Sequence, residues 1–361
     1  MPELRQDIVT GRWVVIATER ALRPESFTRV KTEEVETTAA CPFCYGNEAL
    51  TPPEIMAYRP KNTLPDTPGW TIRVVPNKYP AFVPEYPGRH GKPLVSEGMY
   101  PSMVAIGAHE VIISSPDHYK SLALLSKSQV MKIISSYRDR YLALKEDSRI
   151  RYILIIVNHG REAGASIEHP HSQVFAVPLL PATIKEELVG AYSFFEREKS
   201  CIFCHMIEHE LQEGKSVILE SKNYIVFAPY ASRVPFELWI MPKEHKPSFE
   251  TIRFSEIEDL ASILRTILGK LYKGLSDPPY NYFIHTCPPL GNGRPATPGP
   301  EHREMGIPPI GPEDMIPRVY HWHIEILPKL STAAGFEMGT GIMINIATPE
   351  NVAEYLREMS V

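Results

Sequence analysis

The sequence predicts an α+β fold made of two tandem halves related by duplication, residues 1–177 and 178–361. Each half should be a largely antiparallel sheet packed against one main helix. Two patterns predict the duplication: a C-x-x-C pair, a lone histidine and an H-x-H triplet occur twice in the same order, and so does a helix-then-strand pattern. The length of 361 residues agrees, because a domain averages roughly 150 residues.

In the first half, an apolar strand is expected over residues 109–118, HEVIISSPDH. A capping box, Ser126-x-x-Gln129, then opens a helix whose apolar residues recur at i, i+3 and i+4. Further strands are expected over residues 152–158 and in VFAVPLL, after the H-x-H triplet.

The second half repeats this order after a helical bridge over residues 178–200. The strand FELWIMPKEH, residues 236–245, aligns with residues 109–118 and places Glu237 opposite Glu110. Ser255-x-x-Glu258 reads as the second capping box, and NYFIHT and IEILPKL read as the following strands.

Composition narrows the class of protein. With Lys+Arg 38 against Asp+Glu 43, the net charge of −5 gives no basic excess to attract nucleic acid or an anionic membrane. No apolar run approaches the ~20 residues that span a bilayer, and the first residues do not form a secretory leader. We therefore expect a cytoplasmic globular protein without membrane or nucleic-acid partners.

The paired cysteines, Cys41/Cys44 and Cys201/Cys204, indicate metal binding. Disulfides are improbable in a cytoplasmic protein, and thiolates at C-x-x-C spacing are typical of half a zinc site. The alternative, a redox C-x-x-C, normally lies at a strand-to-helix junction, whereas the sequence after Cys44 is typical of a turn. The remaining ligands follow each pair in the same order, a lone histidine (His118 or His245) and an H-x-H triplet.

The first triplet, His169-Pro170-His171, has features of a reactive site. The preceding segment NHGREAGAS is glycine-containing, and such a loop turns backbone N–H groups toward an anion, with Asn158 and Ser166 as further donors. A neutral imidazole beside a phosphate site attacks phosphorus and forms a transferable phosphoramidate. The plainer alternative is that His169 and His171 both bind metal or lie in the core.

Seven stretches together resemble the galactose-1-phosphate uridylyltransferases of the histidine triad superfamily. They are GRWVVIATERALRP, CPFCYGN, VVPNKYPAF, SPDH, G-x-S-x-x-H-P-H-S-Q, PFELWIMPKEH and HWHIEILPKLSTAAGFEMGTG. The resemblance implies two histidine-triad-like halves and a ping-pong reaction. In it, the catalytic His171 takes the uridylyl group of UDP-glucose and passes it to galactose 1-phosphate, with Gln173 and Ser166 binding the phosphoryl group.

The resemblance also implies two zinc ions per chain, substrate contacts and a homodimer. The ligand sets implied are Cys41, Cys44, His118 and His169 for the first site, and Cys201, Cys204, His245 and His321 for the second. Members of the family with an iron-type second site match a different set: Glu187, His285, His321 and His323. The implied substrate contacts are Asn77, Asn158, Phe336 and Glu337, together with Arg20 and Arg23 supplied across a dimer interface.

Departures from the family pattern leave other functions open. Ser331 stands where many uridylyltransferases carry lysine, and the LPKLSTAAGFEMGTG ending resembles the ADP-glucose phosphorylase branch, which transfers adenylyl to phosphate. A zinc-ribbon module that binds nucleic acid or protein is a weaker hypothesis, because its ligands normally close within ~15 to 20 residues. A nucleotide hydrolase would instead release nucleoside monophosphate.

Overall fold

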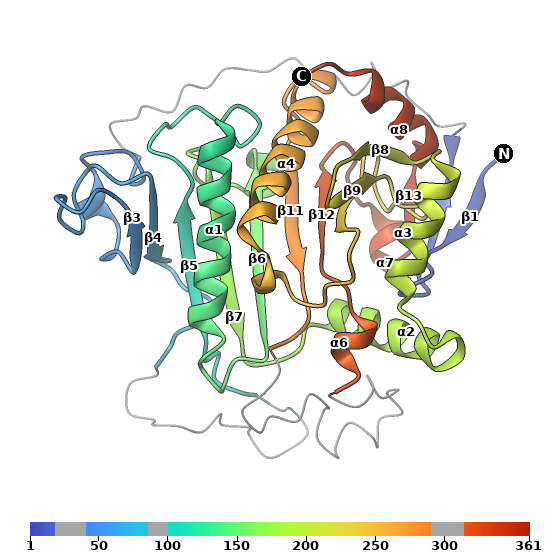
Figure 1. The fold of residues 1–361 in the computed structure, drawn as a ribbon, viewed down its shortest axis with the longest axis horizontal. Helices are drawn as coiled ribbons and strands as arrows, with labels where there is room; N and C mark the ends of the chain where they lie inside the picture. The colour runs from blue at the N-terminus through green and yellow to red at the C-terminus, as the bar shows by residue number, and fades with distance from the viewer. Residues whose placement is uncertain (19–40, 86–99, 101, 290–313) are drawn as a thin grey trace.

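The computed structural model describes residues 1–18, 41–85, 100, 102–289 and 314–361. A ten-stranded sheet runs through the centre of the molecule, and every strand pair in it is antiparallel (Figure 1). In spatial order its strands are β3 (Met56–Tyr58), β4 (Ile72–Pro76), β5 (Ala108–Ile113), β7 (His171–Val177), β6 (Tyr152–His159), β11 (Tyr280–His285), β12 (His323–Pro328), β10 (Leu238–Pro242), β9 (Tyr224–Phe227) and β8 (Val217–Glu220).

The duplication appears as an approximate two-fold relation about the β6–β11 pair. Reading outward from this pair, each half contributes its strands in the same relative order, so that β7 corresponds to β12 and β5 to β10. The predicted α+β fold is confirmed. The two half-sheets join into one because β6 and β11 pair with each other, with Asn158 directly opposite Asn281.

The strand register corrects the alignment of Glu110 with Glu237. Val111 lies opposite Gln173 in the first half, and Trp239 lies opposite the corresponding Glu325 in the second. The counterpart of Glu110 is therefore Leu238. The alignment was anchored at the lone histidines, and the loop before His118 is one residue longer than the loop before His245. Since strand side chains alternate between faces, this single residue moves the two glutamates to opposite faces.

Helices α1 (Lys127–Leu144) and α4 (Phe254–Gly274) lie side by side on one face of the sheet (Figure 1). The Ser126 hydroxyl accepts a hydrogen bond from the Gln129 backbone N–H, which confirms the predicted start of α1. The predicted start of α4 at Ser255 is wrong. The N-cap is Arg253, two residues before Ser255, and the Glu256 carboxylate accepts from the Arg253 backbone N–H at 2.8 Å.

The opposite face of the sheet carries a second layer in the C-terminal half. Helices α2 (Ala182–Glu198), α3 (Ile202–Glu213) and α6 (Ile316–Val319) pack there around the buried Phe203 and Tyr320. In the N-terminal half a smaller cluster around Phe43 and Trp70 occupies this face. Short 3-10 turns are η4 (Glu48–Leu50), η5 (Arg161–Ala163) and η6 (Phe249–Thr251).

A separate three-stranded sheet joins the two ends of the chain. It contains β1 (Glu3–Gln6), β2 (Trp13–Ile16) and β13 (Met343–Asn345), with β13 parallel to β2. The first strands therefore pack beside the C-terminal half, near α7 (Gly335–Thr340) and α8 (Pro349–Glu358) (Figure 1). None of the described helices has the length and apolar character needed to cross a bilayer.

Candidate active site

The first predicted metal set is brought together beside β7. Cys41, Cys44, His118 and His169 each offer one ligand atom, and these atoms all lie within 4.8 Å of one another. Cys44 Sγ lies 3.3 Å from His118 Nδ1 and 3.5 Å from His169 Nδ1, and Cys41 Sγ lies 3.7 Å from His169 Nδ1. A tetrahedral zinc ion with ordinary bond lengths spaces sulfur and nitrogen ligands about 3.6 Å apart, so this donor set fits zinc.

Local structure orients these ligands. The Cys41 carbonyl accepts from the Asn47 amide at 2.8 Å and from the Cys44 backbone N–H at 3.3 Å, which makes the C-x-x-C segment a tight turn. His169 Nε2 donates to the Ser115 carbonyl at 2.7 Å. Because a carbonyl only accepts, the proton stays on Nε2 and Nδ1 presents its lone pair to the metal position.

The second predicted set, Cys201, Cys204, His245 and His321, forms a corresponding cluster in the C-terminal half. Cys204 Sγ lies 3.4 Å from His245 Nδ1 and 3.7 Å from His321 Nδ1. Both rings donate Nε2–H to backbone carbonyls at 2.9 Å, of Pro317 and Pro242. This cluster also fits tetrahedral zinc.

The alternative set that combines His321 with Glu187, His285 and His323 is not formed as predicted, because His321 belongs to the cysteine cluster. The other three gather instead with Glu325. His285 Nδ1 lies 2.8 Å from Glu187, and Arg233 binds Glu325 and Glu237. Burial opposes a charged His285, yet the facing carboxylates Glu187 and Glu325 raise its pKa. Burial likewise opposes an ionised Glu325, but Arg233 and His285 lower its pKa.

His171 begins β7, and its ring opens toward a cavity. Nδ1 donates to the His169 carbonyl at 2.9 Å, so Nε2 carries the lone pair. Burial lowers the pKa of His171, which keeps the imidazole neutral and nucleophilic. Phe43 packs edge-on against the ring at 5.2 Å between centroids.

The cavity in front of His171 has a volume of about 440 Å³. Its polar lining includes three of the predicted substrate-binding or catalytic residues, namely Asn77, Ser166 and Gln173. Asn158 lies in a second, small cavity of about 20 Å³ that also borders His169 and His171. The structure thus gathers four predicted site residues around the His171 imidazole: Gln173, Ser166, Asn77 and Asn158.

A histidine that the sequence analysis did not single out fixes the orientation of Gln173. His109 Nδ1 accepts from the Ala81 backbone N–H at 3.2 Å, so the ring proton is on Nε2. Nε2 lies 2.7 Å from Gln173 Oε1 and donates to it. Burial lowers the pKa of His109, which favours this neutral form. The Gln173 NH₂ group is then left to donate to an anion.

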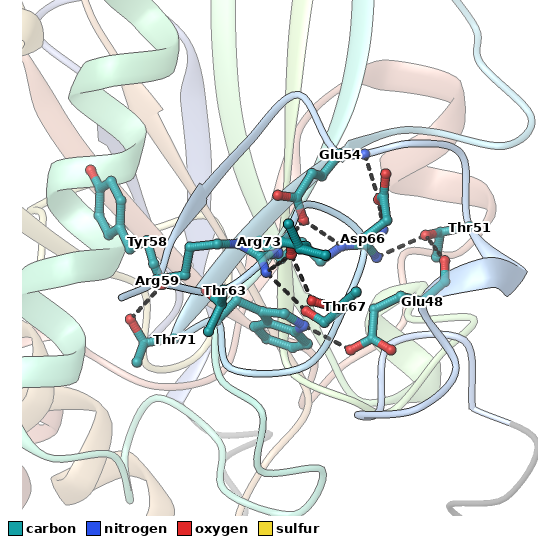
Figure 2. Close-up of polar contacts among 12 residues, drawn as sticks. Glu48, Thr51, Glu54, Tyr58, Arg59, Thr63, Asp66, Thr67, Thr71 and Arg73 are labelled. Atoms are coloured by element: carbon teal, nitrogen blue, oxygen red, sulfur yellow. Dashed lines mark hydrogen bonds and ion pairs between the residues drawn. The ribbon is translucent and has the colours of Figure 1, made fainter. Parts of the chain in front are cut away.

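A buried arginine, Arg73 on β4, anchors the cavity wall (Figure 2). Its guanidinium donates to Thr51 Oγ1 at 2.8 Å and forms ion pairs with Glu54 at 3.2 Å and Asp66 at 2.6 Å. Arg59 also binds Glu54. Leu50, Thr51 and Pro52 line the cavity, so this network holds one wall of the site in place.

Two predicted substrate residues do not line the cavity of their own chain. Phe336 and Glu337 lie on α7, which is near the opposite end of the sheet from β5 and β7 (Figure 1). The Glu337 carboxylate accepts from the Ala334 backbone N–H at 2.9 Å. Arg20 and Arg23 lie outside the described residues.

Sequence reasoning missed His109, Asn281 and Arg73, each of which contacts or supports the site. All three lie within mainly apolar strands, in AHEVII, YNYFIH and IRVVP. A polar residue inside such a strand was the available signal, because buried polar groups need specific partners.

His171 presents a neutral imidazole with a free Nε2 to a cavity lined by amide and hydroxyl donors. This arrangement suits a nucleophile that accepts a group from phosphorus and passes it on. Comparisons with known proteins agree. The model for the N-terminal domain of galactose-1-phosphate uridyl transferase matches residues 1–181, and that for its C-terminal domain matches residues 185–360. The chain belongs to this family, and it is an enzyme of the nucleotidyltransferase or phosphorylase kind.

The chain aligns over its whole length with relatives of two kinds, phosphorylases and uridylyltransferases. It is 35% identical over 362 residues to an ADP-glucose phosphorylase of Arabidopsis thaliana, covering 100% of this chain and 93% of that protein. It is 27% identical over 367 residues to a galactose-1-phosphate uridylyltransferase of Thermotoga maritima, covering 100% and 99%. A crystal structure of an Arabidopsis thaliana ADP-glucose phosphorylase with bound ADP-glucose superposes with a TM-score of 0.78 at 33% identity, covering 100% of both chains.

Proposed function

We propose that this protein is an ADP-glucose phosphorylase that transfers an adenylyl group through His171. The observation that carries this proposal is the 35% identity to the Arabidopsis phosphorylase along the entire chain, against 27% to the Thermotoga uridylyltransferase. From the sequence alone, uridylyl transfer between UDP-glucose and galactose 1-phosphate is the first hypothesis. The comparisons favour its alternative instead.

The reaction proceeds in two displacements at the α-phosphorus. First, His171 Nε2 attacks, the bond from the α-phosphorus to the bridging oxygen breaks, and glucose 1-phosphate leaves. An oxygen of inorganic phosphate then attacks the same phosphorus, the N–P bond breaks, and ADP leaves. Throughout, the Nδ1–H bond to the His169 carbonyl keeps the attacking tautomer and supports the positive charge on the ring.

Amide and hydroxyl donors serve the developing negative charge. Gln173, held by His109, Ser166 in the loop and Asn158 at the end of β6 are the groups around His171 that donate to phosphoryl oxygens. Preorganised donors of this kind stabilise a transition state because they need no reorganisation as charge develops.

Zinc has a structural role in this proposal. Two ions per chain would be held by the two Cys₂His₂ clusters, and four protein ligands leave no position for substrate. An ion in the first cluster would fix His169, whose carbonyl accepts from His171 Nδ1–H and so orients that ring.

The complete site requires a second copy of the chain. Phe336 and Glu337 resemble hexose-binding residues but lie on α7, away from the cavity of their own chain. Phe336 is 48% exposed, so it is available to a neighbouring protomer. We therefore propose a homodimer in which α7 of one protomer reaches the cavity of its partner.

Uridylyl transfer is the second candidate, and the family models and the Thermotoga relative support it. Against it stands Ser331, where many uridylyltransferases have lysine. A donor assay distinguishes the two: ADP-glucose and UDP-glucose are each incubated with the protein, with and without phosphate or galactose 1-phosphate.

The expected result is glucose 1-phosphate released from ADP-glucose in a phosphate-dependent way, with ADP as co-product and UDP-glucose a poor donor. Labelled ADP-glucose alone should leave an acid-labile, base-stable adenylyl group on the protein, and His171→Asn should remove it. UDP-glucose turnover that requires galactose 1-phosphate would support the second candidate. Equal labelling of the His171→Asn protein would contradict both.

A further inference from the structure

We infer that Asn281 of the C-terminal half is a positioning residue for the nucleotidyl transfer, because it fixes the Asn158 amide with its NH₂ group toward the phosphoryl position. This inference rests on the proposed function. Asn281 lines neither of the cavities that border His171, so it acts through Asn158 and not on substrate.

Hydrogen-bond polarity forces this orientation. Asn281 Nδ2 donates to the Ala163 carbonyl at 2.8 Å and to Asn158 Oδ1 at 2.7 Å. The Ala163 carbonyl only accepts, so the Asn281 atom facing it must be the NH₂ nitrogen. That nitrogen's second hydrogen faces Asn158, whose contacting atom must then be the oxygen. The Asn158 NH₂ group is left to donate into the site.

The reversed amide would be unfavourable at both ends. It would place the Asn158 NH₂ against the Asn281 NH₂, and the Asn158 oxygen toward the anionic phosphoryl group. Each contact would leave a half-buried polar group without a partner or against a like charge, which costs more than an ordinary hydrogen bond gains. Asn281 thus determines whether position 158 attracts or repels phosphate.

The same side chain and its neighbours hold the loop over residues 160–166. The bond to the Ala163 carbonyl ties η5 to β11. One residue before Asn281, Tyr280 stacks on His159 with ring centroids 4.8 Å apart. His159 Nε2 also lies 2.6 Å from Asp277. The C-terminal half therefore sets the geometry of the anion-binding loop in the N-terminal half.

Two substitutions at this position separate orientation from packing. Asn281→Asp keeps the shape but only accepts, so Asn158 should rotate to donate to it and turn its oxygen toward the phosphoryl group. Asn281→Ala releases Asn158 without reversing it, and like Asn281→Asp it removes the bond to the Ala163 carbonyl. We expect the rate of adenylyl-His171 formation at saturating ADP-glucose to fall about 10- to 100-fold in Asn281→Asp, the range for a hydrogen bond to a charged group. The loss in Asn281→Ala should be smaller, with KM changing less than kcat in both.

A double-mutant cycle distinguishes positioning of Asn158 by Asn281 from a purely structural effect of Asn281 on the fold. In an Asn158→Ala background, Asn281→Asp should cause a smaller loss than in the wild type, because no amide remains to be turned and only the bond to the Ala163 carbonyl is removed. Asn351→Asp, an identical change at an exposed position of α8, serves as the control and should label His171 at the wild-type rate. Thermal unfolding of each variant checks that it is folded.

The outcomes distinguish this inference from the proposed function. Wild-type labelling by Asn281→Asp, or an undiminished loss in the Asn158→Ala background, overturns the role of Asn281. If the wild type transfers no nucleotide at all, the proposed function fails, and calorimetric binding of AMP still tests the orientation. Asn281→Asp should then weaken AMP binding at least about tenfold, and unchanged binding overturns the inference.

Discussion

Trp239 stacks on His323, with ring centroids 4.7 Å apart and an interplanar angle of 15°. His323 is the C-terminal counterpart of His171, and it also donates Nδ1–H to the carbonyl two residues earlier, at 3.1 Å. Its ring is fully buried. In the N-terminal half the residue corresponding to Trp239 is Val111, whose smaller side chain borders the cavity before His171. Trp239 thus closes the second of the two duplicated sites.

Only one histidine should therefore accept a nucleotide. His171→Asn should abolish adenylyl labelling, whereas His323→Asn should leave it at the wild-type level of one per active site, because Trp239 already excludes substrate. His323→Asn should lower the melting temperature, since it disturbs the buried cluster around Glu325. Mass spectrometry of the labelled protein checks both, and adenylyl found on His323 would show that the second site opens.

Substitution of Arg73 should disrupt the polar network shown in Figure 2 and loosen the cavity wall that the network supports. We expect Arg73→Met to lower the free energy of unfolding by about 3 kcal/mol, the lower end for a broken buried ion pair, because Arg59 still reaches Glu54. The KM for the nucleotide sugar should rise as well. Urea denaturation and initial rates measure these effects.

The matched control is Arg138→Met, which removes a half-exposed pair with Asp139 at 3.2 Å. Its effect should stay below about 1 kcal/mol, as for most surface ion pairs. Equal destabilisation by both variants would show that the Arg73 network contributes no more than a surface contact.

Glu256 at the start of α4 should give a pH-dependent contribution to stability. Although burial opposes its ionisation, hydrogen bonds from Arg253 and the nearby Lys246 lower the pKa of Glu256 to about 2. Because the pKa is lower in the folded state, the stabilisation is fully present above the unfolded value of about 4.3 and fades as pH falls toward 2.

Glu256→Gln should accordingly cost about 1–2 kcal/mol at pH 7, the range for a helix cap, and the difference from wild type should narrow below pH 4.5. Urea midpoints across this range measure it. Glu258→Gln, at an exposed pair with Lys127, is the control and should show a small gap at pH 7. A gap for Glu256→Gln that stays constant down to pH 3 would rule out this linkage.

The order of the motifs predicted which segments meet in the two Cys₂His₂ clusters, because short segments of the same chemistry repeat in each half. The choice of ligand within each H-x-H triplet came from the family resemblance. The same reasoning could not predict the faces of Glu110 and Glu237, since one extra loop residue reverses the alternation of a strand. It also could not find Asn281, because that residue acts through a partner 123 positions away. The sequence also did not predict that β2 pairs with β13, because these strands lie near opposite ends of the chain.

His109 should influence the rate of transfer without contacting substrate phosphorus. His109→Phe keeps a ring to stack on Phe175, now at 4.0 Å between centroids, but removes the donor to Gln173. The Gln173 amide is then free to turn, and adenylyl-His171 formation should slow roughly tenfold, the worth of one such hydrogen bond. His209→Phe, at an exposed position of α3, is the control. An unchanged rate in His109→Phe would mean that Gln173 keeps its orientation unaided.

Loss of each zinc should have a different consequence. We expect two zinc ions per chain by elemental analysis. Cys41→Ser should remove the ion that fixes His169 and with it the orientation of His171, so labelling should be lost. Cys201→Ser should remove the other ion, lower the melting temperature and leave labelling intact below that temperature, because its cluster lies beside the closed His323. If Cys201→Ser, still folded by circular dichroism, fails to label, then the second cluster supports the active site as well, and the two halves are more tightly coupled than the closed site implies.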